Sequence, residues 1–117
     1  MFQGGKTIGR WGETQACSFL ERKGFVVIDQ NYHTTTGEID IVARKNDEVY
    51  FIEVKTRRAG PMAYDLAVTP EKQRRLRRAV SVYCYRRSIR TSIVLASLMV
   101  IVNKRASRVA FRMAVLF

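Results

Sequence analysis

The sequence predicts a single α/β domain in which two helices flank a mixed sheet, with the elements in the order αβββαββ. The first observation behind this prediction is the spacing of apolar residues near the N-terminus and again after residue 69, which repeats as in helices that bury one face. The second is a set of short runs rich in branched residues and separated by turn-forming residues, which is typical of strands. A length of 117 residues, with neither a repeat nor a linker, places this one domain at residues 1–117.

The N-terminal half begins with a predicted helix from Thr7, as the capping residue, to about Lys23, where Gly24 supplies a stop. The stripe that should face the core consists of Ile8, Gly12, Ala16, Phe19 and Leu20. Three strands are expected next, at residues 25–30, 37–44 and 48–56. The polar residues 32–36 indicate a loop. Turn-forming residues at 45–47 predict that the second and third strands pair as a hairpin.

The C-terminal half holds the second predicted helix and two further strands, after a loop at residues 57–69. Pro70 after Thr69 marks the helix start, because proline at the first helical position loses no needed hydrogen bond, and the helix should run to about Arg86. Its core stripe is expected at Leu76, Ala79, Val80 and Tyr83. The apolar run at residues 93–102 is typical of a central strand covered on both faces. A last strand at residues 108–116 is placed to pair back on it.

Composition and charge bear on the partner. Apolar residues make up 47% and charged residues 26%, as in a globular protein rather than a disordered chain. The formal charge of +11 is uneven: residues 1–71 hold 9 basic and all 10 acidic side chains, whereas residues 72–117 hold 12 basic and no acidic ones. The excess of positive charge in residues 72–117 favours a polyanion as partner, and nucleic acid is the commonest polyanion. An anionic membrane surface and a solvated face without a specific partner are the alternatives.

Features of membrane insertion and secretion are lacking. The longest apolar run, at residues 93–102, is too short to span a bilayer, and residues 1–6 have no signal-peptide-like apolar stretch. Cys17 and Cys84 form no CxxC motif and suit reduced packing residues. We therefore expect a cytoplasmic protein, with nucleic acid rather than a membrane as its partner.

Acidic residues gather on the predicted hairpin in a pattern that indicates a metal site. Because strand side chains alternate between faces, Glu38 and Asp40 share one face of their strand, and Glu53 and Lys55 share one face of theirs. If the hairpin joins those faces, two carboxylates and an ammonium meet. Such oxygen ligands suit Mg²⁺. Lys55 would orient a water that attacks a phosphate, or stabilise the negative charge of the transition state of that reaction. The alternative is a surface hairpin of ordinary solvated residues or a simple ion pair.

Two motifs carry a resemblance to a known family: GEIDIV at residues 37–42 and FIEVKTR at residues 51–57. Further residues that fit are Gly12, Glu13, Ala16, Gly24, Asn31, Val68 and Lys72. Over about residues 7–85 the chain resembles the YraN-type family of small bacterial proteins, which is similar to archaeal Holliday junction resolvases within the PD-(D/E)xK nuclease superfamily. The resemblance implies a restriction-endonuclease-like fold with a mixed five-stranded sheet flanked by helices.

The resemblance also implies roles for individual residues. Asp40, Glu53 and the backbone carbonyl of Val54 would bind the metal, Mg²⁺ or Mn²⁺. Lys55 would be the catalytic lysine and Glu13 an accessory acid. The position of Glu13 beside the apolar stripe of the first helix is equally compatible with a salt bridge.

We therefore expect a Mg²⁺-dependent endonuclease that acts on DNA, with branched DNA as one candidate substrate. The alternatives are a non-catalytic nucleic-acid-binding module of the same fold and, with less support, a structural partner in a larger nucleic-acid machine. The residues expected to contact phosphates are Arg57, Lys72, Arg74, Arg77 and Arg78, with solvated surface as the alternative for the helix arginines. No sequence-reading motif is present, so contact without base specificity is expected. A homodimer is a candidate assembly, because such substrates present two scissile bonds related by symmetry.

Overall fold

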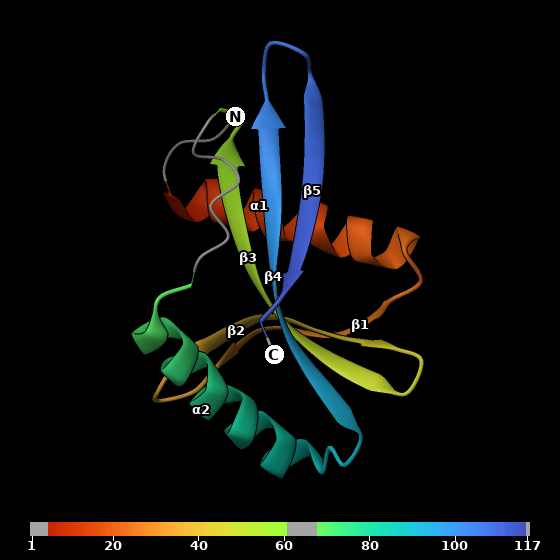
Figure 1. Cartoon of the computed structure of the whole chain (residues 1–117), viewed down its shortest axis with the longest axis vertical. Coiled ribbons are helices and arrows are strands. Elements are labelled where there is room, and N and C mark those ends of the chain that lie inside the picture. The colour runs from red at the N-terminus through yellow and green to blue at the C-terminus, as the bar shows by residue number, and fades with distance from the viewer. Residues whose placement is uncertain (1–4, 61–67, 117) are drawn as a thin grey trace.

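The computed structural model describes residues 5–60 and 68–116, and for residues 5–8 it describes the backbone alone. Seven elements follow one another in the expected order αβββαββ (Figure 1). They are α1 (Gly5–Arg22), β1 (Val26–His33), β2 (Glu38–Lys45), β3 (Glu48–Arg58), α2 (Pro70–Arg87), β4 (Ser92–Asn103) and β5 (Arg108–Val115). The α/β fold class and its element order are thus confirmed.

The five strands form one mixed sheet in the order β1-β2-β3-β4-β5. The pairs β1–β2, β2–β3 and β4–β5 are antiparallel, whereas β3 and β4 are parallel. Parallel neighbours need a crossover connection, and α2 lies between β3 and β4 in the chain to supply it. The predicted hairpin of β2 with β3 and the pairing of the last two strands are both confirmed.

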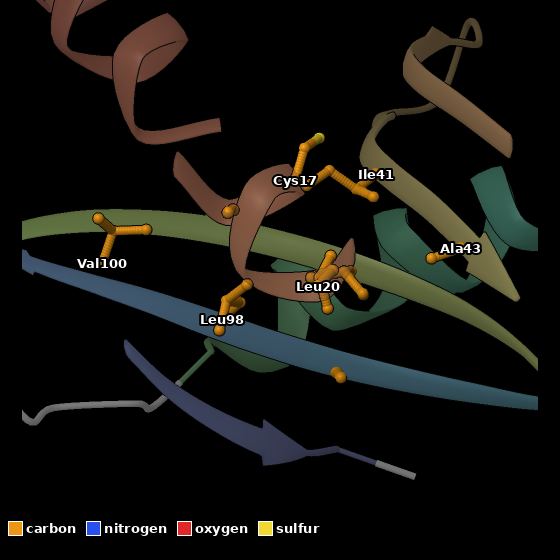
Figure 2. Close-up of a cluster of buried hydrophobic side chains, with 9 residues drawn as sticks. Cys17, Leu20, Ile41, Ala43, Leu98 and Val100 are labelled. Atoms are coloured by element: carbon orange, nitrogen blue, oxygen red, sulfur yellow. The ribbon is translucent and has the colours of Figure 1, made fainter. Parts of the chain in front are cut away.

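The two helices cover opposite faces of the sheet (Figure 1). On one face α1 packs on alternate strand residues in a cluster of Ala16, Cys17, Leu20, Ile41, Ala43, Ile52, Ala96, Leu98 and Val100, most of which Figure 2 labels. On the other face α2 buries Leu76, Ala79, Val80 and Tyr83, as expected, against residues such as Phe51 and Leu95. Both cysteines are free. No helix in the described ranges is long and apolar enough to cross a membrane.

Two of the helix ends that the sequence predicts are formed by local hydrogen bonds. Gly24 adopts a φ of 90°, and the Phe25 amide donates to the carbonyl of Leu20, which closes α1 with a left-handed turn that favours glycine. At the start of α2, the side chain of Thr69 accepts a hydrogen bond from the Lys72 amide at 3.2 Å. The residue at which α2 begins is therefore fixed by its cap.

Three local predictions are wrong. The helical backbone of α1 begins at Gly5, so Thr7 lies inside the helix and is not its cap. The expected loop at residues 32–36 starts later, because Tyr32 and His33 pair with β2 and extend β1. β3 continues to Arg58 rather than ending at residue 56, because its last residues pair with β4. β1 and β3 are both longer than predicted because their last residues pair with a neighbouring strand, and the polarity of those residues does not indicate such pairing. The rest of the predicted loop at 57–69 includes residues 61–67, outside the described ranges.

Candidate functional site

The candidate site forms where β2 and β3 stop pairing. Their register runs from Lys45 opposite Glu48 to Ile41 opposite Ile52, and the next position in this register would set Asp40 opposite Glu53. Beyond this point the link between the strands is made by a side chain, because the Val54 amide donates a hydrogen bond to Oδ2 of Asp40 at 2.8 Å. The two predicted ligands are therefore brought together, with Asp40 anchored to the strand that carries Glu53.

Asp40 and Glu53 line a cleft of about 500 Å³ between the diverging strands. The cleft draws residues from both helices as well as from β2 and β3: Glu13, Gly37, Glu38, Asp40, Glu53, Val54, Thr69, Glu71, Lys72, Arg75 and Leu76. Five of these are carboxylic acids and two are cations. The centre of the cleft is therefore anionic, and its two cations lie on the side formed by α2.

Glu13 follows Gly12, where α1 packs closely on β3. A Cβ on Gly12 would overlap the hydroxyl of Thr56, so a larger residue here would force that side chain to move. The pKa of Glu13 is raised mainly by burial and further by the charge of Glu38, while a hydrogen bond with the Asn31 side chain lowers it. Glu13 and Asp40 therefore line the same cleft, and the role of Glu13 as an accessory acid stays a prediction.

Asp40 is the most perturbed carboxyl of the cleft. Its pKa is raised from 3.8 to about 7, mainly by burial and in smaller part by the charges of Glu13, Glu38 and Glu53, against the lowering effect of the Val54 hydrogen bond. The ionised carboxylate is thus disfavoured by its surroundings at neutral pH. A cation placed beside it would reverse this balance.

Glu53 already has a cation beside it. Its side chain is 10% exposed, and its Oε1 forms an ion pair with Nζ of Lys72, which is 57% exposed. Lys72 lies in the first turn of α2, where the helix dipole disfavours a positive charge. The carboxylate of Glu53 offsets this cost, so the ammonium is held at the cleft rather than directed to solvent.

A second ion pair lies farther along the same helix. Nη2 of Arg75 is 2.7 Å from Oε1 of Glu71, and both side chains line the cleft while remaining mostly exposed. Surface pairs of this kind contribute little to stability. Arg75 therefore remains able to exchange Glu71 for another anion that enters the cleft.

Ser97 of β4 lies beside Glu53 in the parallel register of β3 and β4. It is fully buried, and within the described part of the chain its Oγ has no hydrogen-bond partner. Neighbouring residues in register share a face of the sheet, so this hydroxyl lies on the face that carries Glu53. A buried polar atom without a partner is a cost that a functional site can retain.

The other predicted residues lie outside the cleft lining. Lys55 shares the β3 face of Glu53 and is half-buried two residues farther on, and Arg57 follows it as an exposed residue. Arg74, Arg77 and Arg78 are exposed on α2, as expected, but Lys72 and Arg75 are the cations that face the cleft. The structure thus gathers Glu13, Asp40, Glu53, Val54 and Lys72 in the cleft, and leaves Arg74, Arg77 and Arg78 on the outer surface of α2.

The residues present fit a hard divalent cation. In the two ranges that the structure describes, no three histidine, cysteine or carboxylate side chains are grouped so as to hold a metal ion by themselves. Mg²⁺ needs less, since it keeps several waters and takes one or two protein carboxylates. Asp40, destabilised by burial and by like charges, together with Glu53 supplies that number of oxygen donors.

Sequence reasoning missed Arg75 and Ser97 and did not assign Glu38 to the site. Glu38 could have been included, because it shares a strand face with Asp40 two residues on. Arg75 stands one helical turn after Lys72, which is also a readable signal. The position of Ser97 depends on the register of β4 against β3, for which the sequence offers no signal.

Comparison with known proteins finds a family model and several relatives that match most of the chain. The model of the Uncharacterised protein family UPF0102 matches residues 12–109. A UPF0102 protein of Syntrophomonas wolfei is 40% identical over 79 residues, which cover 67% of this chain and 69% of that protein. A UPF0102 protein of Dictyoglomus turgidum is 41% identical over 86 residues, 73% of each chain. The matched range includes every residue of the cleft.

Proposed function

The chain belongs to the UPF0102 family, and we propose that it is a metal-dependent endonuclease that hydrolyses phosphodiester bonds of DNA, with branched DNA as one candidate substrate. The observation that carries this proposal is the convergence of Asp40 and Glu53 in one cleft whose α2 side holds Lys72 and Arg75. Two carboxylates suit a divalent cation, and the cations beside them suit a phosphate. The family assignment supports the resemblance to YraN-type proteins on which the residue roles rest.

The proposed roles follow from position. Asp40, Glu53 and the carbonyl of Val54 would hold Mg²⁺ or Mn²⁺, which when bound neutralises charge on the phosphate and polarises water. Asp40 is oriented by its hydrogen bond from the Val54 amide. Lys55, on the same β3 face as Glu53, would direct its ammonium to the attacking water or to the charge that develops on the phosphate.

Lys72 has a role that changes with the state of the cleft. In the metal-free protein its ammonium is the counter-ion of Glu53. A divalent cation on Glu53 would repel this ammonium, and the long exposed side chain can then turn to a nucleic-acid phosphate. One residue would thus compensate the ligand charge before binding and contact the substrate afterwards.

A nuclease assay over linear, nicked, flapped and four-way DNA, with Mg²⁺ or Mn²⁺, tests the proposal. Asp40→Asn and Lys55→Ala should each abolish cleavage, whereas Asp47→Asn in the exposed β2–β3 turn should cleave as wild type does. Without metal, Asp40→Asn should bind DNA as tightly as wild type or more tightly, because a negative charge facing the phosphates is gone. Lys55→Ala should bind slightly less tightly. Cleavage by Asp40→Asn at the wild-type rate would exclude this site as the source.

A non-catalytic nucleic-acid-binding module is the second candidate. The observation that favours it is the ion pair between Lys72 and Glu53, which neutralises one of the two proposed ligands without a metal. This candidate takes precedence if wild-type protein binds DNA with a steep salt dependence but cleaves no substrate in the panel. Binding in that case should not require Mg²⁺.

A further inference from the structure

The β3–β4–β5 part of the sheet carries a row of basic residues that leads away from the cleft. In register, Lys55 pairs with Met99, which pairs with Arg112, and Arg57 pairs with Ile101. Since residues paired across strands share a face, Lys55, Arg57 and Arg112 lie on the same face as Glu53. From Glu53 onward, the side chains that follow on this face of β3 are therefore basic.

This basic row ends in an exposed hairpin. β3 ends with Arg58 opposite Val102, and the chain of β4 continues past that end into the turn toward β5, as the blue ribbons at the top of Figure 1 show. Residues 103–110 are all exposed. The hairpin carries Lys104, Arg105 and Arg108, and the sequence has no acidic residue after Glu71 to neutralise them.

The hairpin and α2 flank the cleft. α2 begins at the cleft with Lys72 and runs back to the residues before Ser92, which pairs with Glu48 at the start of β3. The hairpin lies beyond the opposite end of β3. From Ser97, beside Glu53, to Lys104 is seven residues of strand, or roughly 23 Å. This distance is shorter than one turn of a B-form duplex, which is roughly 34 Å. A duplex of one turn or more that is bound at the cleft is therefore long enough to reach the hairpin.

The chemistry of the hairpin turn favours nucleic acid over a lipid surface. Its residues 103–108 are Asn-Lys-Arg-Ala-Ser-Arg, so the turn exposes cations and hydrogen-bond donors but no large apolar side chain. A segment that binds a membrane surface buries bulky apolar residues beside its cations. A two-stranded ribbon with arginine at its tip fits phosphates along a groove instead.

We propose that the β4–β5 hairpin, through Lys104, Arg105 and Arg108, binds the phosphate backbone of a nucleic-acid duplex that extends from the cleft. The proposal rests on the nucleic-acid function proposed above and names a surface that function did not assign. Arg57 lies between the cleft and the hairpin and continues the same contact. The contact is to phosphates, so it orients the duplex without reading its sequence.

The test measures binding of a fluorescent duplex of about 20 base pairs, two helical turns, in EDTA so that nothing is cleaved. The variant Lys104→Ala/Arg105→Ala/Arg108→Ala should raise the Kd at least tenfold. Each phosphate contact adds about 0.9 to the slope of log K against log salt, so the slope should fall by about 2 to 3. An unchanged slope would overturn the proposal.

A matched variant separates this surface from net charge alone. Lys23, Arg44 and Arg90 are exposed and lie at the other end of β3 and β4, where Arg44 pairs with Val49 and Arg90 precedes Ser92. Replacing these three with alanine removes the same charge and should change the Kd less than threefold. Equal losses in the two triple variants would overturn the hairpin proposal. If wild type binds no duplex, the proposed function and the hairpin proposal both fail. If wild type binds and the hairpin variant binds equally well, the hairpin proposal alone is overturned.

A crosslinking measurement reports which part of the protein lies next to the bound duplex. A photoreactive label on Ala106→Cys in the hairpin turn should crosslink to the duplex, and the same label on Asp47→Cys in the β2–β3 turn should not. Both variants carry Cys84→Ser, and Cys17 is buried in the core and so protected from labelling. Crosslinking at residue 47 but not at residue 106 would place the duplex at the other end of the sheet.

Discussion

Replacing Asp40 with asparagine is expected to stabilise the metal-free protein above neutral pH while abolishing the proposed cleavage. The rise of its pKa from 3.8 to about 7 corresponds to about 4 kcal/mol against the ionised carboxylate, because each tenfold change in proton affinity is worth about 1.36 kcal/mol. Asparagine carries no charge and its oxygen can still accept the hydrogen bond of the Val54 amide. We therefore expect Asp40→Asn to gain about 2–4 kcal/mol in free energy of unfolding at about pH 8.

The pH dependence of this gain has a definite sign. The folded protein binds the proton of Asp40 more tightly than the unfolded chain does, so wild type is most stable with respect to this group below its unfolded pKa of 3.8. That contribution is lost as the pH rises toward about 7. The advantage of Asp40→Asn should therefore be absent near pH 3.8, grow between there and pH 7, and stay constant above it.

Urea unfolding in EDTA, followed by the fluorescence of the single tryptophan Trp11, measures the difference. Asp47→Asn, in the exposed β2–β3 turn, is the control and should differ from wild type by less than about 0.5 kcal/mol. Added Mg²⁺ should stabilise wild type and leave Asp40→Asn unchanged, because the variant lacks the ligand charge. Equal or lower stability of Asp40→Asn at about pH 8 would refute the reasoning.

Three further predictions concern the residues around the cleft. Lys72→Met should raise the affinity for Mn²⁺ about tenfold in calorimetric titration, since it removes the ammonium that competes for Glu53, and Arg74→Gln on the outer face of α2 should not. Gly12→Ala should destabilise the protein by about 1–3 kcal/mol in urea unfolding through overlap with the Thr56 hydroxyl, and adding Thr56→Ala should recover most of the loss. Ser97→Ala should stabilise by about 1 kcal/mol, because it removes a buried hydroxyl without a partner, and a loss of stability in the same measurement would reveal such a partner.

The element order and the placement of Asp40 near Glu53 follow from short-range patterns that the sequence contains. Turn residues at 45–47 join two strands that are adjacent in the chain, and two-residue alternation then sets which side chains share a face. Helical spacing likewise sufficed for the buried stripe of α2. These features depend on residues a few positions apart, so one sequence determines them.

The tertiary structure alone decided how distant elements meet. The divergence of β2 from β3 at Asp40 lets Glu13 of α1 and Lys72 of α2 reach one cleft, and the close approach of Gly12 to Thr56 depends on where α1 crosses the sheet. Likewise, the parallel register sets Ser97 beside Glu53 and Met99 beside Lys55, on the strand that leads into the β4–β5 hairpin. The sequence contains no local signal for these contacts, because they join residues tens of positions apart and are selected by packing of the whole core.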